Sequence, residues 1–141
     1  MWLVIPKNSN YQPLIFMRKI LIVSSDRNLL GLLKYELSLR NYTVLAEDDP
    51  YQTFVHINEF APDLLIVDLI LDEYNGGAIS HQVKSNAQMN DIPIIVLSDY
   101  ELETRYASRF GCDMVIQKTE DLHPVIDAIN HLFLERELMP T

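Results

Sequence analysis

Three residues with different functional groups each close a short apolar run of the chain: Asp68, Ser98 and Lys118. Such runs are typical of strands buried on both faces of a parallel sheet. The carboxyl ends of these strands meet at one edge, where ligands bind. At such an edge a carboxylate can act as a nucleophile, while a hydroxyl and an ammonium group bind the transferred oxygens. The three residues therefore predict a phosphoryl site with Asp68 as its phosphoacceptor.

The elements that must position these residues alternate along the chain. Apolar runs predict five strands, and apolar residues at helical spacing predict five helices. This alternation predicts an α/β fold with a doubly wound, five-stranded parallel sheet and helices on both faces. The predicted strands cover 19–23, 43–46, the run 62–68, 92–97 and 114–117. The first predicted helix has its cap at Asn28 or Asp26 and ends at about Arg40. The next three cover 50–60, 77–84 and 102–110, and the last begins at Asp121 and Pro124.

Composition and charge exclude several classes of protein. With 141 residues, 48% of them hydrophobic, the chain can form one domain. Its net charge of -9 argues against direct nucleic-acid binding. Cys112 is the only cysteine, which excludes a disulfide framework and a zinc cluster and fits a reducing compartment. Because the chain also lacks a membrane-length apolar run and a secretory leader, we expect a soluble cytoplasmic protein without membrane contact.

The domain boundaries follow from where the alternating pattern begins and ends. We expect a domain over residues 17–136 and a short tail over 137–141. Residues 1–16 match no pattern well, and we expect them to be an extension outside the domain; the alternative is an arm that packs on the domain or on a partner. Because only a few residues follow the last predicted helix, we expect a stand-alone protein without an output module.

The spacing of the candidate residues is also a family signature. Gly76 follows Asp68 by 8 residues, Ser98 follows it by 30 and Lys118 by 50. With these spacings the chain resembles, over about residues 18–134, the response-regulator receiver domains of two-component signalling. The resemblance implies the sheet order 2-1-3-4-5 and a signalling protein rather than an enzyme. It also implies phosphorylation of Asp68 by a histidine kinase or a phosphotransfer protein.

The chain departs from this family most clearly at its magnesium ligands. Receiver domains usually end their first strand with two adjacent acidic residues, where this chain has Ser24 and Ser25. Asp26 is the only acid nearby. Since Mg²⁺ can be held by one or two carboxylates plus phosphate and water, we expect it to bind weakly, through Asp26, Asp68 and the Ile70 carbonyl, or not at all. Without the acidic pair, Lys118 is free to pair with Asp68 and to hold the domain in one state.

Further departures lie around the same edge. Receiver domains usually have a Met-Pro pair after the phosphoacceptor, a small residue after the hydroxyl, an aromatic before the lysine and a proline after it. This chain has other residues at all of these positions. The Lys118–Thr119 peptide has thereby lost the proline that normally permits a cis bond. The replacing residues are Leu71 and Asp72, Asp99, Val115 and Thr119.

Two functions fit these residues. The first is a stand-alone receiver that passes a phosphorelay signal at Asp68 through protein contacts. The second is a pseudo-receiver, an interaction module that works without phosphorylation, with homodimerisation possible in either case. A third class, a small flavin carrier, is disfavoured. It would need a phosphate-binding loop after the first strand that is richer in Ser, Thr and Gly than the loop of this chain, which has only Ser24 and Ser25. The partner surface implied by the resemblance is the fourth helix, fifth strand and fifth helix, around Arg105, Arg109, Val115 and Asp127.

Overall fold

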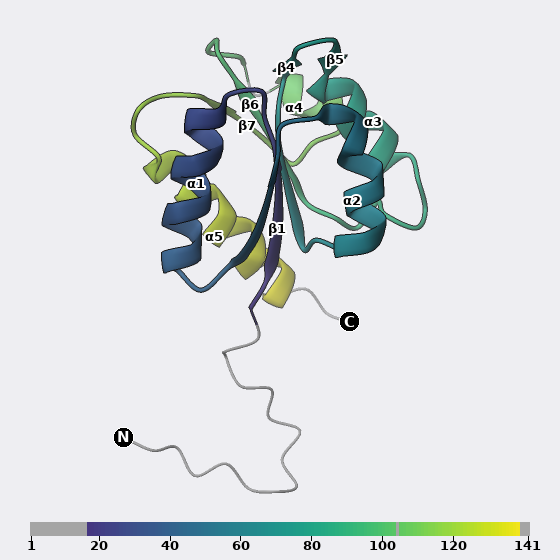
Figure 1. Cartoon of the computed structure of the whole chain (residues 1–141). Coiled ribbons are helices and arrows are strands. Elements are labelled where there is room, and N and C mark those ends of the chain that lie inside the picture. Colours follow the sequence, from purple (N-terminus) through teal and green to yellow (C-terminus); the bar gives the residue numbers. More distant parts are fainter. Residues whose placement is uncertain (1–16, 104, 139–141) are drawn as a thin grey trace, which may run out of the picture.

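The elements of the domain are visible in Figure 1, a computed structural model that describes residues 17–103 and 105–138. Strands and helices alternate as predicted, apart from one short hairpin and one 3₁₀ turn. In chain order they are β1 (Lys19–Val23), α1 (Arg27–Leu39), β2 (Thr43–Glu47), η1 (Pro50–Gln52), α2 (Thr53–Phe60), β3 (Leu64–Asp68), β4 (Ile70–Leu71), β5 (Tyr74–Asn75), α3 (Gly76–Lys84), β6 (Ile94–Ser98), α4 (Arg105–Phe110), β7 (Met114–Gln117) and α5 (His123–Leu138).

The main sheet has five strands in the order β2-β1-β3-β6-β7. Every neighbouring pair in it is parallel. Counted among the main strands alone, this is the predicted order 2-1-3-4-5. The central strand β3 is buried along its whole length because it has a neighbour on each side and helices on both faces. The carboxyl ends of β1, β3, β6 and β7 thus come to one edge.

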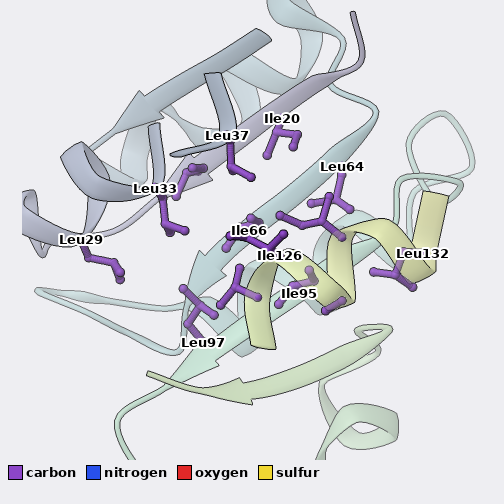
Figure 2. Packing of buried hydrophobic residues seen from close by; sticks show 14 of the residues in the cluster. Ile20, Leu29, Leu33, Leu37, Leu64, Ile66, Ile95, Leu97, Ile126 and Leu132 are labelled. Atoms are coloured by element: carbon purple, nitrogen blue, oxygen red, sulfur yellow. The ribbon is translucent and has the colours of Figure 1, made fainter. Parts of the chain in front are cut away.

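Helices cover both faces of the sheet (Figure 1). Helices α1 and α5 pack on one face, where Leu33 and Leu37 of α1 and Ile126 of α5 belong to one apolar cluster with Ile66 of β3 (Figure 2). Helices α2, α3 and α4 pack on the other face, where Ile79 of α3 belongs to a second apolar cluster. Two separate cores, one on each face, explain why the central strands read as continuous apolar runs.

Helix α1 shows how local sequence sets the element that borders the site. Its N-cap is Asp26, whose side chain accepts a hydrogen bond from the Leu29 amide at 3.1 Å. Of the two caps considered, Asp26 is therefore correct, and Asn28 lies inside the helix. Helix α4 is followed by Gly111, whose φ of 71° lies in the left-handed region typical of a helix C-cap.

Several predicted boundaries were wrong for identifiable reasons. Helix α4 begins at Arg105 rather than Leu102, and none of its residues is fully buried. Strand β6 begins at Ile94 rather than Ile92 because the Ile92 amide bonds to the Met89 carbonyl and Pro93 has no amide hydrogen to donate.

The remaining differences concern short elements and the last helix. The segment from Pro50 to Phe60, predicted as one helix, starts with the 3₁₀ turn η1. The loop after Asp68, predicted to lack regular structure, forms the small antiparallel pair β4–β5. Helix α5 continues to Leu138, past the boundary set at residue 136. The extension over residues 1–16 lies outside the described residues.

Candidate functional site

Asp68 lies at the carboxyl end of β3, and its side chain is almost fully buried, with 1% of its surface exposed. The chain leaves it through β4 and β5 and returns to Gly76. A Cβ atom on Gly76 would stand 1.9 Å from the Asp68 carbonyl oxygen, far inside van der Waals contact. Glycine is therefore required here because the backbone that starts α3 passes directly over the Asp68 peptide.

The Asp68 carboxyl group makes two contacts through one oxygen. Its Oδ2 accepts a hydrogen bond from the Ser24 hydroxyl at 2.5 Å and another from Lys118 Nζ at 3.3 Å. Its Oδ1 is buried and has no hydrogen-bond partner among the described residues. An unpartnered buried acceptor costs free energy, so this oxygen has unused bonding capacity.

Lys118 is shared between two carboxylates. Its ammonium group lies 3.3 Å from Asp68 Oδ2 and 3.0 Å from Asp99 Oδ1. Burial by itself would lower the pKa of Lys118, but hydrogen bonds to Asp99 and the charge of Asp68 outweigh it and leave the pKa raised. Lys118 is thus firmly cationic. The predicted pairing of Lys118 with Asp68 is present, and Asp99 adds a second anchor.

The environment of Asp68 raises the pKa of its carboxyl group. Burial raises its pKa, and the hydrogen bond from Ser24 and the positive charge of Lys118 offset only part of this effect. Asp99 acts in the same direction as burial because it is a second negative charge nearby. The site therefore holds one positive group, Lys118, between two acids, Asp68 and Asp99.

Ser98 occupies the expected strand end, but its hydroxyl serves the local turn. It is fully buried, and its Oγ accepts a hydrogen bond from the Tyr100 amide at 3.0 Å. The Lys118 amide donates to the Ser98 carbonyl at 2.7 Å, so β6 and β7 are joined next to the site. Among the described residues, no hydrogen bond links the Ser98 side chain to Asp68 or Lys118.

The residues considered as magnesium ligands do not form a carboxylate cluster. Asp26 is exposed and uses its carboxylate to cap α1. The described ranges contain no group of three or more His, Cys, Asp or Glu residues placed to hold a metal ion. Asp68 Oδ1 is a spare oxygen ligand, yet one oxygen next to the Lys118 ammonium is a poor fit for Mg²⁺, which prefers several oxygen ligands around it.

Ser24 is the site residue whose role the sequence did not reveal. It stands in the first position of the missing acidic pair, is fully buried, and donates to Asp68 while accepting from the Asp26 amide at 3.0 Å. Ser25 is half-buried, and its hydroxyl accepts from the Asp72 amide at 3.3 Å. The available signal was the position of Ser24 directly after a buried strand that neighbours β3.

The other departures lie around this edge without joining it. Tyr100, two residues after Ser98, is 65% exposed. Val115 is half-buried in β7. The described residues contain no cis peptide, so Lys118–Thr119 is trans. On the proposed partner surface, the Arg105 and Arg109 guanidinium groups lie 5.6 and 6.0 Å from the Tyr106 ring centre, within cation–π range.

Comparison with known proteins agrees with the fold. A family model described as the response regulator receiver domain matches residues 20–130. The response regulator ArlR of Staphylococcus saprophyticus is 31% identical over 113 residues, which are 80% of this chain and 51% of that protein. The alkaline phosphatase synthesis regulatory protein PhoP of Bacillus subtilis is 25% identical over 101 residues, 72% of this chain and 42% of PhoP. The chain thus spans about half the length of these relatives.

Solved structures show the same fold at low identity. The response regulator TrrA of Thermotoga maritima, in complex with Mg²⁺-BeF, superimposes with a TM-score of 0.73 at 22% identity, covering 82% of this chain and 99% of TrrA. The chemotaxis protein CheY4 of Vibrio cholerae gives 0.75 at 16% identity, covering 82% and 98%.

The parallel sheet with an aspartate and a lysine at its edge therefore defines a signalling module of the two-component class. The chain belongs to the response regulator receiver domain family. Receiver domains are signalling modules rather than enzymes, and they work with histidine kinases and downstream partners. In the part of the chain that the structure describes, no helix is long and apolar enough to span a membrane.

Proposed function

We propose that this chain is a pseudo-receiver, a signalling module that acts through protein contacts without depending on phosphorylation of Asp68. One observation carries the proposal: the buried Asp68 carboxyl group is already bonded to Ser24 and Lys118. Ser24 stands where the family has an acidic residue, so a hydroxyl that donates to Asp68 replaces a carboxylate that would have repelled it.

The charges around the site support the same conclusion. Phosphoryl transfer to a carboxylate requires cationic groups that neutralise both the nucleophile and the incoming oxygens. Here Lys118 lies within 3.3 Å of Asp68 Oδ2 and 3.0 Å of Asp99 Oδ1, so its single charge is already shared. Burial also raises the pKa of Asp68. With its one neighbouring cation already shared, Asp68 lacks the charge neutralisation that attack on a phosphoryl donor requires.

A second candidate is the conventional role, in which Asp68 accepts a phosphoryl group from a histidine kinase or a phosphotransfer protein. The observation that favours it is the convergence of Asp68, Ser98 and Lys118 at one sheet edge. In this case weak Mg²⁺ binding would use the spare Asp68 Oδ1, the Ile70 carbonyl and Asp26. The receiver domain of RstA from Klebsiella pneumoniae, which has the same fold, has been solved in a BeF₃-activated form.

In either role the output surface is the α4–β7–α5 face, around Arg105, Arg109, Val115 and Asp127. Arg105 and Arg109 are exposed, and they carry positive charge on a chain whose net charge is -9. An acidic partner surface would fit them. A stand-alone protein and a homodimer through this face are further parts of the proposal.

The deciding experiment compares phosphorylation of the parent with that of the Ser24→Asp, Ser25→Asp double variant. Both proteins are incubated with acetyl phosphate and millimolar Mg²⁺, and the added phosphoryl mass is measured on the intact protein. We expect little modification of the parent and a large gain in the double variant. An Asp68→Asn version of each protein shows whether the added mass resides on Asp68.

Stoichiometric modification of Asp68 in the parent would overturn the pseudo-receiver proposal in favour of the conventional role. Equal, low modification of the parent and the double variant would mean that the acidic pair is not what limits the chemistry. A Ser25→Asp single variant separates the effects of the two serines on phosphorylation, because of the two only Ser24 donates to Asp68.

A further inference from the structure

Asp99 lies beside Lys118 because the two residues directly follow neighbouring strands. Strands β6 and β7 are parallel, and Ser98 pairs with Gln117 at their carboxyl ends. One residue further on, Asp99 and Lys118 extend this register, so their side chains emerge on the same side of the sheet. Lys118 Nζ lies 3.0 Å from Asp99 Oδ1. The pairing of the strands therefore brings an acid to the ammonium group.

The turn after β6 holds Asp99 in place. The Ser98 hydroxyl accepts a hydrogen bond from the Tyr100 amide at 3.0 Å, so the residues on both sides of Asp99 are joined to each other. The Lys118 amide donates to the Ser98 carbonyl at 2.7 Å, which joins this turn to the end of β7. Because the backbone is fixed on both sides, little conformational freedom is lost when the Asp99 carboxylate pairs with Lys118.

The two acids that share Lys118 differ in their access to solvent. Asp68 is buried and the Lys118 side chain is 17% exposed, whereas the Asp99 side chain is 53% exposed. A cavity of about 350 Å³ opens next to the pair, and Asp99, Lys118 and Glu120 are among the residues that line it. An anion that approaches Lys118 through this cavity therefore meets a position that the Asp99 carboxylate already holds.

The main consequence of the Asp99 contact is the position of the ammonium group. An ion pair with an exposed partner contributes little to stability. An ammonium group at this edge is suited to bind phosphoryl oxygens, and the small residue that receiver domains usually have after the hydroxyl would leave its outer side free for them. In this chain a carboxylate, which is also an anion that accepts through two oxygens, occupies that side.

We propose that Asp99 is a positioning residue that acts through Lys118, with its carboxylate in place of phosphoryl oxygens as the outer partner of the ammonium group. Asp99 thereby holds the end of β7 against the turn after β6 without a phosphoryl group on Asp68. This role deepens the pseudo-receiver function, on which its meaning for signalling rests, because it names the residue that keeps the site in one state.

Removing the Asp99 carboxylate should loosen this contact, and an added anion should restore it. We expect the Tyr100 and Lys118 amides to exchange with solvent several-fold faster in Asp99→Asn than in the parent, as measured by NMR. Inorganic phosphate added to Asp99→Asn should return their exchange and their resonances toward the parent values, and chloride at the same ionic strength should not. Asp99→Glu keeps the carboxylate and should behave like the parent.

Glu120→Gln is the matched control. Glu120 is exposed and lines the same cavity, but in the described part of the chain it forms no ion pair with Lys118. Adding Lys118→Gln to Asp99→Asn should remove the response to phosphate, and circular dichroism verifies that each variant is folded. The proposal would be overturned by parent-like exchange in Asp99→Asn, by an equal effect of Glu120→Gln, or by a phosphate effect that chloride reproduces or that survives Lys118→Gln.

This experiment separates the role of Asp99 from the pseudo-receiver function. It contains no phosphoryl donor, so a negative result concerns the contact between Asp99 and Lys118 alone. Stoichiometric modification of Asp68 by acetyl phosphate in the parent concerns the pseudo-receiver function alone, and it leaves the exchange and phosphate results for Asp99 unchanged.

Discussion

At the scale of single residues, the site depends on one hydroxyl. Ser24 donates to Asp68 at 2.5 Å and accepts from the Asp26 amide at 3.0 Å, so it links the end of β1 to the end of β3 and to the cap of α1. An aspartate at this position would face Asp68 with like charge. Serine therefore stabilises the buried carboxyl group without a metal ion, which is the physical basis of the proposed pseudo-receiver.

Removing this hydroxyl should cost stability. The Ser24→Ala variant leaves Asp68 Oδ2 with Lys118 alone and leaves the Asp26 amide without its acceptor, so we expect a loss of about 1–3 kcal/mol in the free energy of unfolding. Urea denaturation measures it. The neighbouring Ser25→Ala variant is the control, since Ser25 is half-buried and accepts one long bond of 3.3 Å. Equal effects of the two variants would contradict a special role for Ser24.

The raised pKa of Asp68 predicts a specific pH dependence. Because burial raises this pKa above the ordinary 3.8, the folded state holds the proton more tightly than the unfolded state does. The contribution of Asp68 to stability is therefore complete below pH 3.8 and is lost as the pH rises through the folded-state pKa. The Asp68→Asn variant lacks this loss.

We therefore expect Asp68→Asn to gain stability relative to the parent as the pH rises above 3.8, by at most about 1.4 kcal/mol per pH unit, and then to reach a plateau. Urea unfolding of both proteins across this range gives the difference directly. Asp72→Asn, at an exposed residue, controls for the loss of one negative charge. A difference that shrinks with rising pH would show that Asp68 is better stabilised as the carboxylate.

At the scale of elements, the start of α3 is fixed by a close backbone approach. We expect Gly76→Ala to destabilise the domain by about 1–3 kcal/mol or more, as overpacking does, because a Cβ atom would lie 1.9 Å from the Asp68 carbonyl oxygen. Gly31→Ala is the control: it has nothing within 4 Å, lies in α1, and should gain about 0.5–1 kcal/mol. Thermal or urea unfolding of the two variants measures both changes in stability. A Gly76→Ala variant as stable as the parent would contradict the clash.

Asp26 has two candidate roles, as the N-cap of α1 and as a metal ligand, and substitutions distinguish them. As a cap it accepts from the Leu29 amide at 3.1 Å, a role that asparagine also fills. We expect Asp26→Ala to cost about 1 kcal/mol of stability and Asp26→Asn only a few tenths. If Asp26 were a metal ligand instead, both variants would weaken Mg²⁺ binding measured by calorimetry. An equal loss of stability in the two variants would argue against the cap.

The elements also show which features of the fold and site can be predicted from sequence patterns. The main strands and the meeting of Asp68 with Lys118 were predicted because buried parallel strands are apolar throughout and their carboxyl ends share one edge. The β4–β5 hairpin was missed because two-residue strands have no periodicity. The Ser24–Asp68 bond was missed because no local pattern encodes which side chain following β1 reaches across to β3. The spacing gave the position of Asp68, whereas its bonding partners required the structure.

At the scale of the whole molecule, the balance of charge decides how the domain responds to divalent cations. The chain carries 20 acidic and 11 basic residues, with a net charge of -9. Residues 48, 49, 72 and 73, all acidic, line a cavity of about 400 Å³ next to Ser25, where Arg27 is the basic group. Adding two more acids at 24 and 25 places like charges beside this cavity and against Asp68. Serines at these positions therefore lower the repulsion that a bound cation would otherwise have to neutralise.

The stability of the whole domain should therefore reveal whether a cation is needed. Without Mg²⁺ we expect the Ser24→Asp, Ser25→Asp double variant to be less stable than the parent. With Mg²⁺ it should recover, by about 2.7 kcal/mol once the free ion reaches 100 times its dissociation constant. The parent should show no such gain in urea unfolding at matched ionic strength, with Na⁺ in place of Mg²⁺ as the control. A parent that gains as much as the double variant would have a working cation site, since only specific binding to the folded state raises stability in this way, and the hydroxyl of Ser24 would then not be a substitute for the ion.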